Sequence, residues 1–359
     1  MSGATELRSD GFNIWGYIKR LPLTTLLIGG MFVAILIIGK IVGFSIATEF
    51  TYILQRFSYW SVLVLAMVPS IQSGTGPNFA LPVGISAGLL GMVIVMELQL
   101  MGAAFIIASI LVSIVIACVF GYIYGRLMNA VKGSEMAIAT YTGFAITGFF
   151  SMVWLIYPIT NQSIGFFLGP GLRILVSLET FAANKILENF LAFNLFGTII
   201  PTGTLLLFGV FAALVFLFFR SKTGVAISAV GMNPVFARAT GVNVDRSRII
   251  ANMMSTCLGA VGIIVYAQGF GFVQFYDAPL MMAFPAVASV LVGGASAQRS
   301  KVFNVIIGCF LFQGLLTTAP PVIGRLLTDV DADITNPVRM IVQYGVILYA
   351  LTKMSGGTK

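Results

Sequence analysis

Long apolar runs separated by short polar segments make up most of the chain from residue 22 onward. Several of these runs approach the roughly 20 residues that a helix needs to cross the hydrocarbon core of a bilayer. The pattern predicts an all-α integral membrane protein with about ten transmembrane helices. We place these helices at 22–43, 59–71, 82–98, 101–125, 136–158, 196–219, 250–269, 279–297, 302–318 and 339–353.

Composition agrees with this pattern, because 58% of the 359 residues are hydrophobic and only 9% are charged. A typical soluble domain has about 25% charged residues. We therefore expect a single transmembrane domain over 22–355 in contact with the lipid bilayer, preceded by a cytoplasmic N-terminal segment at 1–21.

The basic residues sort to one side of the predicted bundle. With a cytoplasmic N-terminus, 14 of the 20 Lys and Arg residues fall on the inner side, 5 fall on the outer side, and Lys40 lies near the outer end of the first span. The five outer residues are Arg56, Arg173, Lys185, Arg325 and Arg339. The positive-inside rule therefore predicts that both termini are cytoplasmic. Because the charges form small clusters and no continuous basic stripe, they do not indicate nucleic-acid binding.

Helix breakers interrupt the apolar pattern at about 69–82, where Pro, Gly and Ser residues are frequent. Irregular backbone at membrane depth is tolerated where protein or a watery cavity satisfies its polar groups, and in transporters such a broken helix contacts the solute. An ordinary exposed turn between two short spans explains the same composition. If the segment lines a path, its candidate residues are Gln72, Ser73, Thr75, Asn78 and Phe79.

A second candidate lining lies in the predicted span at 136–158. It includes Tyr141 and Thr142, followed by Thr147 and Phe149. Small and hydroxyl side chains also serve helix packing, so these residues have a structural explanation as well.

The largest predicted cytoplasmic loop covers 220–249 and includes a short helix at about 233–241. Asn233 is suited to the N-cap position, Pro234 to the first helical position, and Gly241 to the residue after the helix. Val235, Phe236 and Ala239 form an apolar patch on this helix. The patch either docks on a partner protein or lies against lipid headgroups.

Two predicted outer segments are less apolar. The segment at 159–195 is expected to contain short interfacial or re-entrant pieces. The segment at 319–338 contains Pro320 and Pro321 and the acidic residues Asp329, Asp331 and Asp333, which lack the Gly and Glu of a calcium loop. We expect a solvated loop there.

Several kinds of chemistry are missing from the residue inventory. The chain has no histidine, and no sequence matching the phosphate-binding loop of nucleotide-binding proteins. The three cysteines lie in apolar runs, where a buried thiol is the simplest interpretation. We therefore expect no enzyme activity, metal site or cofactor in this chain, so that any ATP hydrolysis must come from another polypeptide.

Ionisable residues within the predicted spans are few, with Lys40 and Glu97 near predicted ends. Ion-coupled carriers usually have such groups in the membrane, so this distribution weakens that alternative. A secondary transporter, a passive solute channel and a scaffold protein stay open as alternatives.

The chain resembles the permease subunits of ABC importers for ribose-type sugars, autoinducer-2, branched-chain amino acids and nucleosides. The resemblance rests on Gly231-x-Asn233-x-x-x-Ala237-x-x-x-Gly241, on Asp245-Arg246, and on the run from Val292 to Ser296. It implies that Gly231, Asn233, Pro234, Phe236, Ala237, Arg238 and Gly241 couple the permease to a cytoplasmic ATP-binding subunit.

The same resemblance implies that the ATPase binds ATP and Mg²⁺. It also implies two further protein partners, which are a second permease subunit of the same or a sibling kind and an extracellular or periplasmic solute-binding protein. The implied location is the prokaryotic plasma (inner) membrane. The expected solute is small and polar, with a sugar preferred and a nucleoside or amino acid possible. The stretch Gly76–Gly84 lacks the acidic residue of sugar-type members, so the solute stays open.

Overall fold

The computed structural model describes residues 22–166, 170–326 and 335–355, and most of these residues are helical. The long helices are α2 (Leu23–Ile41), α3 (Ile46–Leu65), α5 (Leu81–Glu97), α6 (Gly102–Ala130), α7 (Glu135–Ile156), α9 (Thr202–Arg220), α12 (Val244–Phe270), α13 (Ala278–Val292), α14 (Val302–Leu326) and α15 (Thr335–Ser355). Short helices α4 (Met67–Gln72), α10 (Lys222–Met232) and α11 (Pro234–Ala239) lie between them. The prediction of an all-α membrane protein is confirmed.

Each of the ten predicted crossings overlaps one of the long helices. Within the described residues, six are long and apolar enough to cross a membrane: α2, α6, α7, α9, α12 and α14. Apolar helices or helical segments of 10–17 residues occur at Leu81–Glu97, Ala278–Val292 and Met340–Tyr349. The chain is thus a multi-pass helical membrane protein.

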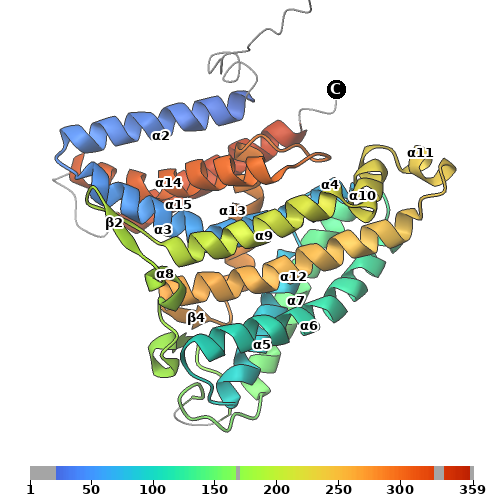
Figure 1. Cartoon of the computed structure of the whole chain (residues 1–359), viewed down its shortest axis with the longest axis horizontal. Helices are drawn as coiled ribbons and strands as arrows, with labels where there is room; N and C mark the ends of the chain where they lie inside the picture. The colour runs from blue at the N-terminus through green and yellow to red at the C-terminus, as the bar shows by residue number, and fades with distance from the viewer. Residues whose placement is uncertain (1–21, 167–169, 327–334, 356–359) are drawn as a thin grey trace, which may run out of the picture.

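Helix α12 forms the centre of the bundle, where it packs against α3, α5 and α6 (Figure 1). In contrast, α6 exposes an apolar stripe at four-residue intervals, formed by Ile107, Leu111, Val115, Val119 and Ile123. Residues at this spacing share one helix face. An unbroken apolar stripe on the outside of the bundle is the surface that lipid chains cover.

The two ends of the bundle differ. The α10–α11 segment lies at one end, and the end of α15 and the beginning of α2 lie toward the same side, whereas α8 (Ile186–Asn189) and β2 (Phe193–Leu195) lie at the opposite end (Figure 1). The described part of α2 therefore begins, and that of α15 ends, on the side of the 220–249 loop (Figure 1).

The second crossing begins earlier than predicted. We placed its start at residue 59, but α3 begins at Ile46, so Arg56 lies within a helix and not in an outer loop. The prediction failed because Glu49, Gln55 and Arg56 lower the apolar character of this half of α3. Packing accommodates Gln55 and Arg56: the Gln55 amide donates to Glu188, and the Arg56 guanidinium lies 5.0 Å from the centre of the Phe270 ring.

The predicted outer loop at 319–338 was also wrong in its first part. Helix α14 continues through Pro320 and Pro321 to Leu326. Each proline removes a backbone N–H from the helix, which is tolerated in membranes where neighbouring groups compensate. Thr317 and Thr318 donate hydroxyl hydrogen bonds to the carbonyls of Gln313 and Gly314 just before the prolines. The acidic residues Asp329, Asp331 and Asp333 lie outside the described residues.

The segment between α7 and α9 contains short elements, as expected. It comprises β1 (Leu175–Ser177), the 3₁₀ helix η1 (Leu178–Phe181), α8 and the hairpin of β2 with β3 (Thr198–Ile200). Strand β1 pairs antiparallel with β4 (Phe272–Gln274), which directly follows α12. The Glu188 carboxylate anchors α8 on α3 by accepting hydrogen bonds from Tyr59 and Gln55.

Candidate functional site

The break between the second and third crossings is shorter than predicted. Pro69 to Gln72 belong to helix α4, and α5 begins at Leu81, so the non-helical stretch covers 73–80. Gly74 and Gly76 have φ angles of +76° and +83°, values that glycine adopts without strain. Helical hydrogen bonding ends at the start of this stretch, where the N–H groups of Ser73 and Gly74 donate to the carbonyls of Pro69 and Ile71.

Hydroxyl groups bond to backbone carbonyls in the break and at the end of α4. The Ser73 hydroxyl donates to the Ser70 carbonyl (2.8 Å), and the Ser70 hydroxyl donates to the Gly76 carbonyl (2.7 Å). The Thr75 hydroxyl lies 3.0 Å from both serine hydroxyls. Ser70, Ser73 and Thr75 are all buried, so this segment is an internal polar cluster and not an exposed turn.

Helix α12 supplies the partners on the other side of the break. The Asn78 amide donates to the Ser255 hydroxyl (2.8 Å), which in turn donates to the carbonyl of Ala66 (2.6 Å). Asn252 lies one turn earlier on α12 and approaches the Thr75 hydroxyl at 3.5 Å. Asn252 and Ser255 are both fully buried polar residues in the middle of an apolar bundle.

Asn78 has an unused hydrogen-bonding group. Its side chain is 1% exposed, and its Oδ1 atom has no hydrogen-bond partner among the described residues. Burying an amide oxygen without a partner costs about 1–3 kcal/mol. Such a group is suited to accept a hydrogen bond from a transient ligand.

The polar residues of α7 are arranged differently. Tyr141 is 69% exposed on the outside of the bundle, and the Thr142 hydroxyl donates to the carbonyl of Ile138 in its own helix (2.7 Å). Helix α7 does contact the break, but through Gly143, where an added Cβ atom would lie 2.9 Å from the Phe79 carbonyl oxygen. Tyr141 and Thr142 are therefore not part of the buried cluster.

The short helix predicted at about 233–241 is α11, at Pro234–Ala239. The Asn233 side chain accepts hydrogen bonds from the backbone N–H groups of Val235 (3.1 Å) and Phe236 (3.0 Å), as an N-cap residue does. Gly241 has a φ angle of +84°, which suits the residue that ends a helix.

One face of α11 is anchored and the other is free. Ala237 is buried against Val230 of α10 and Val244 of α12. Val235 and Phe236 are 80% and 64% exposed. Arg238 is also exposed. An apolar pair on a helix that is well anchored outside the apolar spans has the form of a docking surface.

A buried ion pair connects the beginnings of α7 and α12. Arg248 lies 3.1 Å from Glu135, with side-chain exposures of 8% and 16%. The Arg248 carbonyl also accepts a hydrogen bond from the Asn252 amide (3.0 Å). One turn of α12 thus separates Arg248 from Asn252 of the polar cluster.

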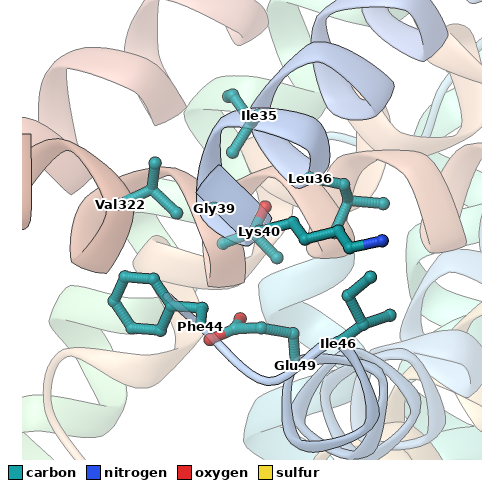
Figure 2. Close-up of a pocket in the computed structure, with 9 residues that line it drawn as sticks. Ile35, Leu36, Gly39, Lys40, Phe44, Ile46, Glu49 and Val322 are labelled. Atoms are coloured by element: carbon teal, nitrogen blue, oxygen red, sulfur yellow. The ribbon is translucent and has the colours of Figure 1, made fainter. Parts of the chain in front are cut away.

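A small pocket lies where the last turns of α2 and α14 meet the beginning of α3 (Figure 2). The Glu49 carboxylate points toward Phe44, and the Lys40 amine points away from it (Figure 2). The volume is about 10 Å³, which is at the lower limit for one water molecule. A sugar-sized solute does not fit in this pocket.

Sequence reasoning missed several polar residues of the cluster. The candidate residues of the break do not include Ser70. Asn252 and Ser255 lie within the predicted span at 250–269, for which no polar role is predicted. Asn252 and Ser255 are three positions apart and therefore lie on the same face of α12. Two polar residues at this spacing in an apolar run could have indicated the cluster from the sequence.

Comparison with known proteins assigns the class that this architecture suggests. Residues 49–351 match the family model described as "Branched-chain amino acid transport system / permease component". The chain therefore belongs to this family of ABC permease subunits.

Two curated proteins are similar over part of the chain. A nucleoside ABC transporter permease protein, NupB, of Lactococcus lactis subsp. cremoris (strain MG1363) is 31% identical over 29% of this chain and 28% of its own length. A probable ABC transporter permease protein, YphD, of Escherichia coli (strain K12) is 32% identical over 30% of this chain and 33% of its own length. The matched region thus spans a third or less of these relatives. No solved structure matches the chain.

Proposed function

We propose that this chain is the membrane-spanning permease subunit of an ATP-driven importer, and that it moves a small polar solute by alternating access. The observation that carries the proposal is α11, a capped helix outside the apolar spans that exposes Val235 and Phe236. A cytoplasmic ATPase subunit, which holds ATP and Mg²⁺, docks on this helix. Membership in a family of transport permeases supports the assignment.

The remaining partners follow from the same proposal. A second permease subunit completes the path, and an extracellular or periplasmic solute-binding protein delivers the solute to the outer face. The chain lies in the prokaryotic inner membrane with both termini in the cytoplasm. Neither the family match nor the two relatives favour an ion-coupled carrier or a passive channel.

The solute is proposed to be small, polar and uncharged. The break offers hydroxyl and amide groups from Ser73, Thr75 and Asn78 and no carboxylate or amine. A sugar or a nucleoside fits this chemistry, because both present several hydroxyl groups. One relative is named a nucleoside permease, which independently supports a nucleoside as the solute.

The mechanism requires that nucleotide binding change the relative stability of two permease conformations. A ligand shifts such an equilibrium only by its difference in affinity for the two states. ATP-bound and ATP-free forms of the ATPase must therefore bind α11 differently, and the helix must carry the difference to the spans. The N-cap of Asn233 and the buried contact of Ala237 make α11 stiff enough for this purpose.

Association with the ATPase tests the proposal directly. Phe236→Asp places a charge in the docking surface, where an unpaired buried charge costs several kcal/mol. We expect the ATPase subunit to be lost on co-purification, while the permease reaches normal abundance in the membrane. Thr223→Asp is the matched control, because Thr223 is exposed in the first turn of α10, where a negative charge is favourable.

A complex that survives Phe236→Asp and dissociates with Thr223→Asp contradicts the docking role of α11. Equal retention of the ATPase by both variants does so as well.

Topology is tested by cysteine labelling in intact cells after replacement of the native cysteines. Ser221→Cys lies just before α10, and Phe196→Cys replaces a residue that is 95% exposed at the tip of the β2–β3 hairpin. We expect a membrane-impermeant maleimide to label Phe196→Cys only. Labelling of Ser221→Cys from outside contradicts the orientation.

A further inference from the structure

The cytoplasmic loop contacts the break directly through the backbone. Gly231, in the last turn of α10, lies so close to the break that an added Cβ atom would be 2.1 Å from the Gln72 carbonyl oxygen and 3.0 Å from the Gly74 nitrogen. A Cβ on Gly74 would in turn lie 3.0 Å from the Gly231 Cα atom. Only glycine at both positions permits this approach.

The Gln72 side chain joins three segments that are far apart in the sequence. Its Oε1 atom accepts a hydrogen bond from the Ser228 hydroxyl of α10 (3.2 Å). Its Nε2 atom donates to the carbonyl of Ser300, in the segment between α13 and α14. Both ends of the amide are therefore engaged with protein, and Gln72 connects the end of α4 to α10 and to the 293–301 segment.

The connection from α11 to Gly231 of α10 is rigid. Val230, next to Gly231 in α10, is fully buried with Ala237 of α11 and Val244 of α12. Asn233 is the only residue between α10 and α11. A displacement of α11 is therefore passed on to the last turn of α10, which contains Gly231.

The connection continues from Gln72 into the membrane. Ser73 follows Gln72 directly and lies 3.0 Å from the Thr75 hydroxyl, which approaches Asn252 of α12. On the cytoplasmic side, Gln72 borders a cavity of about 690 Å³ lined also by Ser228, Gly293 and Arg299. The cavity separates part of the 293–301 segment from α10, and Arg299 still reaches the Met232 sulfur at the end of α10 (3.6 Å).

We propose that Gln72 is a positioning residue that, together with the contact between Gly231 and Gly74, transmits the movement of α11 to the break. This inference rests on the proposed function, since it assigns the route by which the docked ATPase acts. It gives Gln72 a mechanical role in place of the solute contact that its polar character predicts.

Two substitutions separate the hydrogen bonds from the steric contact. Gln72→Glu keeps the shape and the acceptor for Ser228, but its carboxylate cannot donate to the Ser300 carbonyl and repels it. Gly231→Ala forces the two backbones apart. Gln298→Glu is the control for charge, because Gln298 is exposed in the same segment as Ser300. Gly209→Ala is the control for volume, since a Cβ at Gly209 meets nothing within 4 Å.

The reporter is a single cysteine in the break. Ser73→Cys is introduced after Cys118, Cys257 and Cys309 have been replaced by alanine, and the complete complex with its ATPase is reconstituted in lipid. The rate of alkylation by N-ethylmaleimide is measured without nucleotide and after trapping with MgATP and vanadate. Because Ser73 is fully buried, the rate reports how often the break opens.

We expect the alkylation rate of the parent to differ between the two states by about fivefold or more, a typical size for coupled sites. In Gln72→Glu and Gly231→Ala the ratio falls to near one, while the ATPase stays bound. Both controls keep the parental ratio. If Gly231→Ala does not accumulate in the membrane, the nearly isosteric Gln72→Glu decides the question.

If the ratio of the two alkylation rates in Gln72→Glu equals that of the parent, the inference is overturned and the proposed function stays intact. A parent whose alkylation does not respond to nucleotide also overturns the inference, because the break is then not the element that moves. Failure of the ATPase to bind the parent chain overturns the proposed function and the inference together.

Discussion

The break at 73–80 and helix α7 both place polar side chains within apolar surroundings, but they use them in opposite ways. In the break, Thr75 and Asn78 reach across to α12 and contact Asn252 and Ser255. In α7, Thr142 bonds to its own helix and Tyr141 lies on the exposed surface. The residue types are similar, and the difference lies in the backbone.

Loss of helical hydrogen bonding explains this difference. A threonine in a helix has the carbonyl four residues earlier within reach and satisfies itself there. A non-helical segment leaves backbone groups without partners, so its side chains are recruited to satisfy them and are held in fixed positions. Polar residues in a span therefore indicate a ligand path more strongly where the helix is broken.

The largest effect is expected at Asn78. Asn78→Leu removes the hydrogen bond to Ser255 and the unpaired Oδ1 atom while it preserves bulk. Loss of the Ser255 hydrogen bond together with the proposed solute contact at Oδ1 lowers transport by roughly tenfold or more. Uptake of labelled sugars and nucleosides into cells that express the complete transporter, normalised to permease abundance in the membrane, measures the effect. If Asn78→Leu takes up solute as fast as the unmodified protein, the break has no role in transport and only connects two helices.

A smaller effect is expected at Tyr141, if its exposed side faces the path between two permease subunits. Tyr141→Phe removes one hydroxyl group, and a single hydrogen bond of about 1 kcal/mol changes KM by about fivefold. The maximal rate and the membrane abundance should not change. A KM equal to that of the unmodified protein places Tyr141 outside the path.

The smallest effect is expected at Thr142. Thr142→Val removes a hydroxyl group that bonds only within α7, so uptake should stay close to that of the unmodified protein. Thermal unfolding of the purified permease, followed in detergent, should also be nearly unchanged. A loss of uptake comparable to that of Asn78→Leu removes the distinction between the two regions.

The elements that local sequence determines were predicted well. The cap at Asn233, the proline after it and Gly241 define α11 to within two residues, because capping depends on neighbours in the chain. The apolar runs locate α2, α6, α7, α9, α12 and the first part of α14 for the same reason.

Features that depend on distant partners could not be read from the sequence. The first half of α3 looks too polar for a span until Glu188 and Phe270 are seen to pack against Gln55 and Arg56. The bond from Gln72 to Ser300 joins residues 228 positions apart. The continuation of α14 through Pro320 likewise depends on its packed environment and not on local propensity.

The central claim is that α11 couples this permease to ATP hydrolysis in a partner subunit. The most direct measurement is the rate of ATP hydrolysis by the complete transporter in lipid, with and without the loaded solute-binding protein. The account predicts that the loaded protein stimulates hydrolysis in the unmodified complex and in Thr223→Asp, and that Phe236→Asp abolishes the stimulation. Equal stimulation in Phe236→Asp and in the unmodified complex would contradict it.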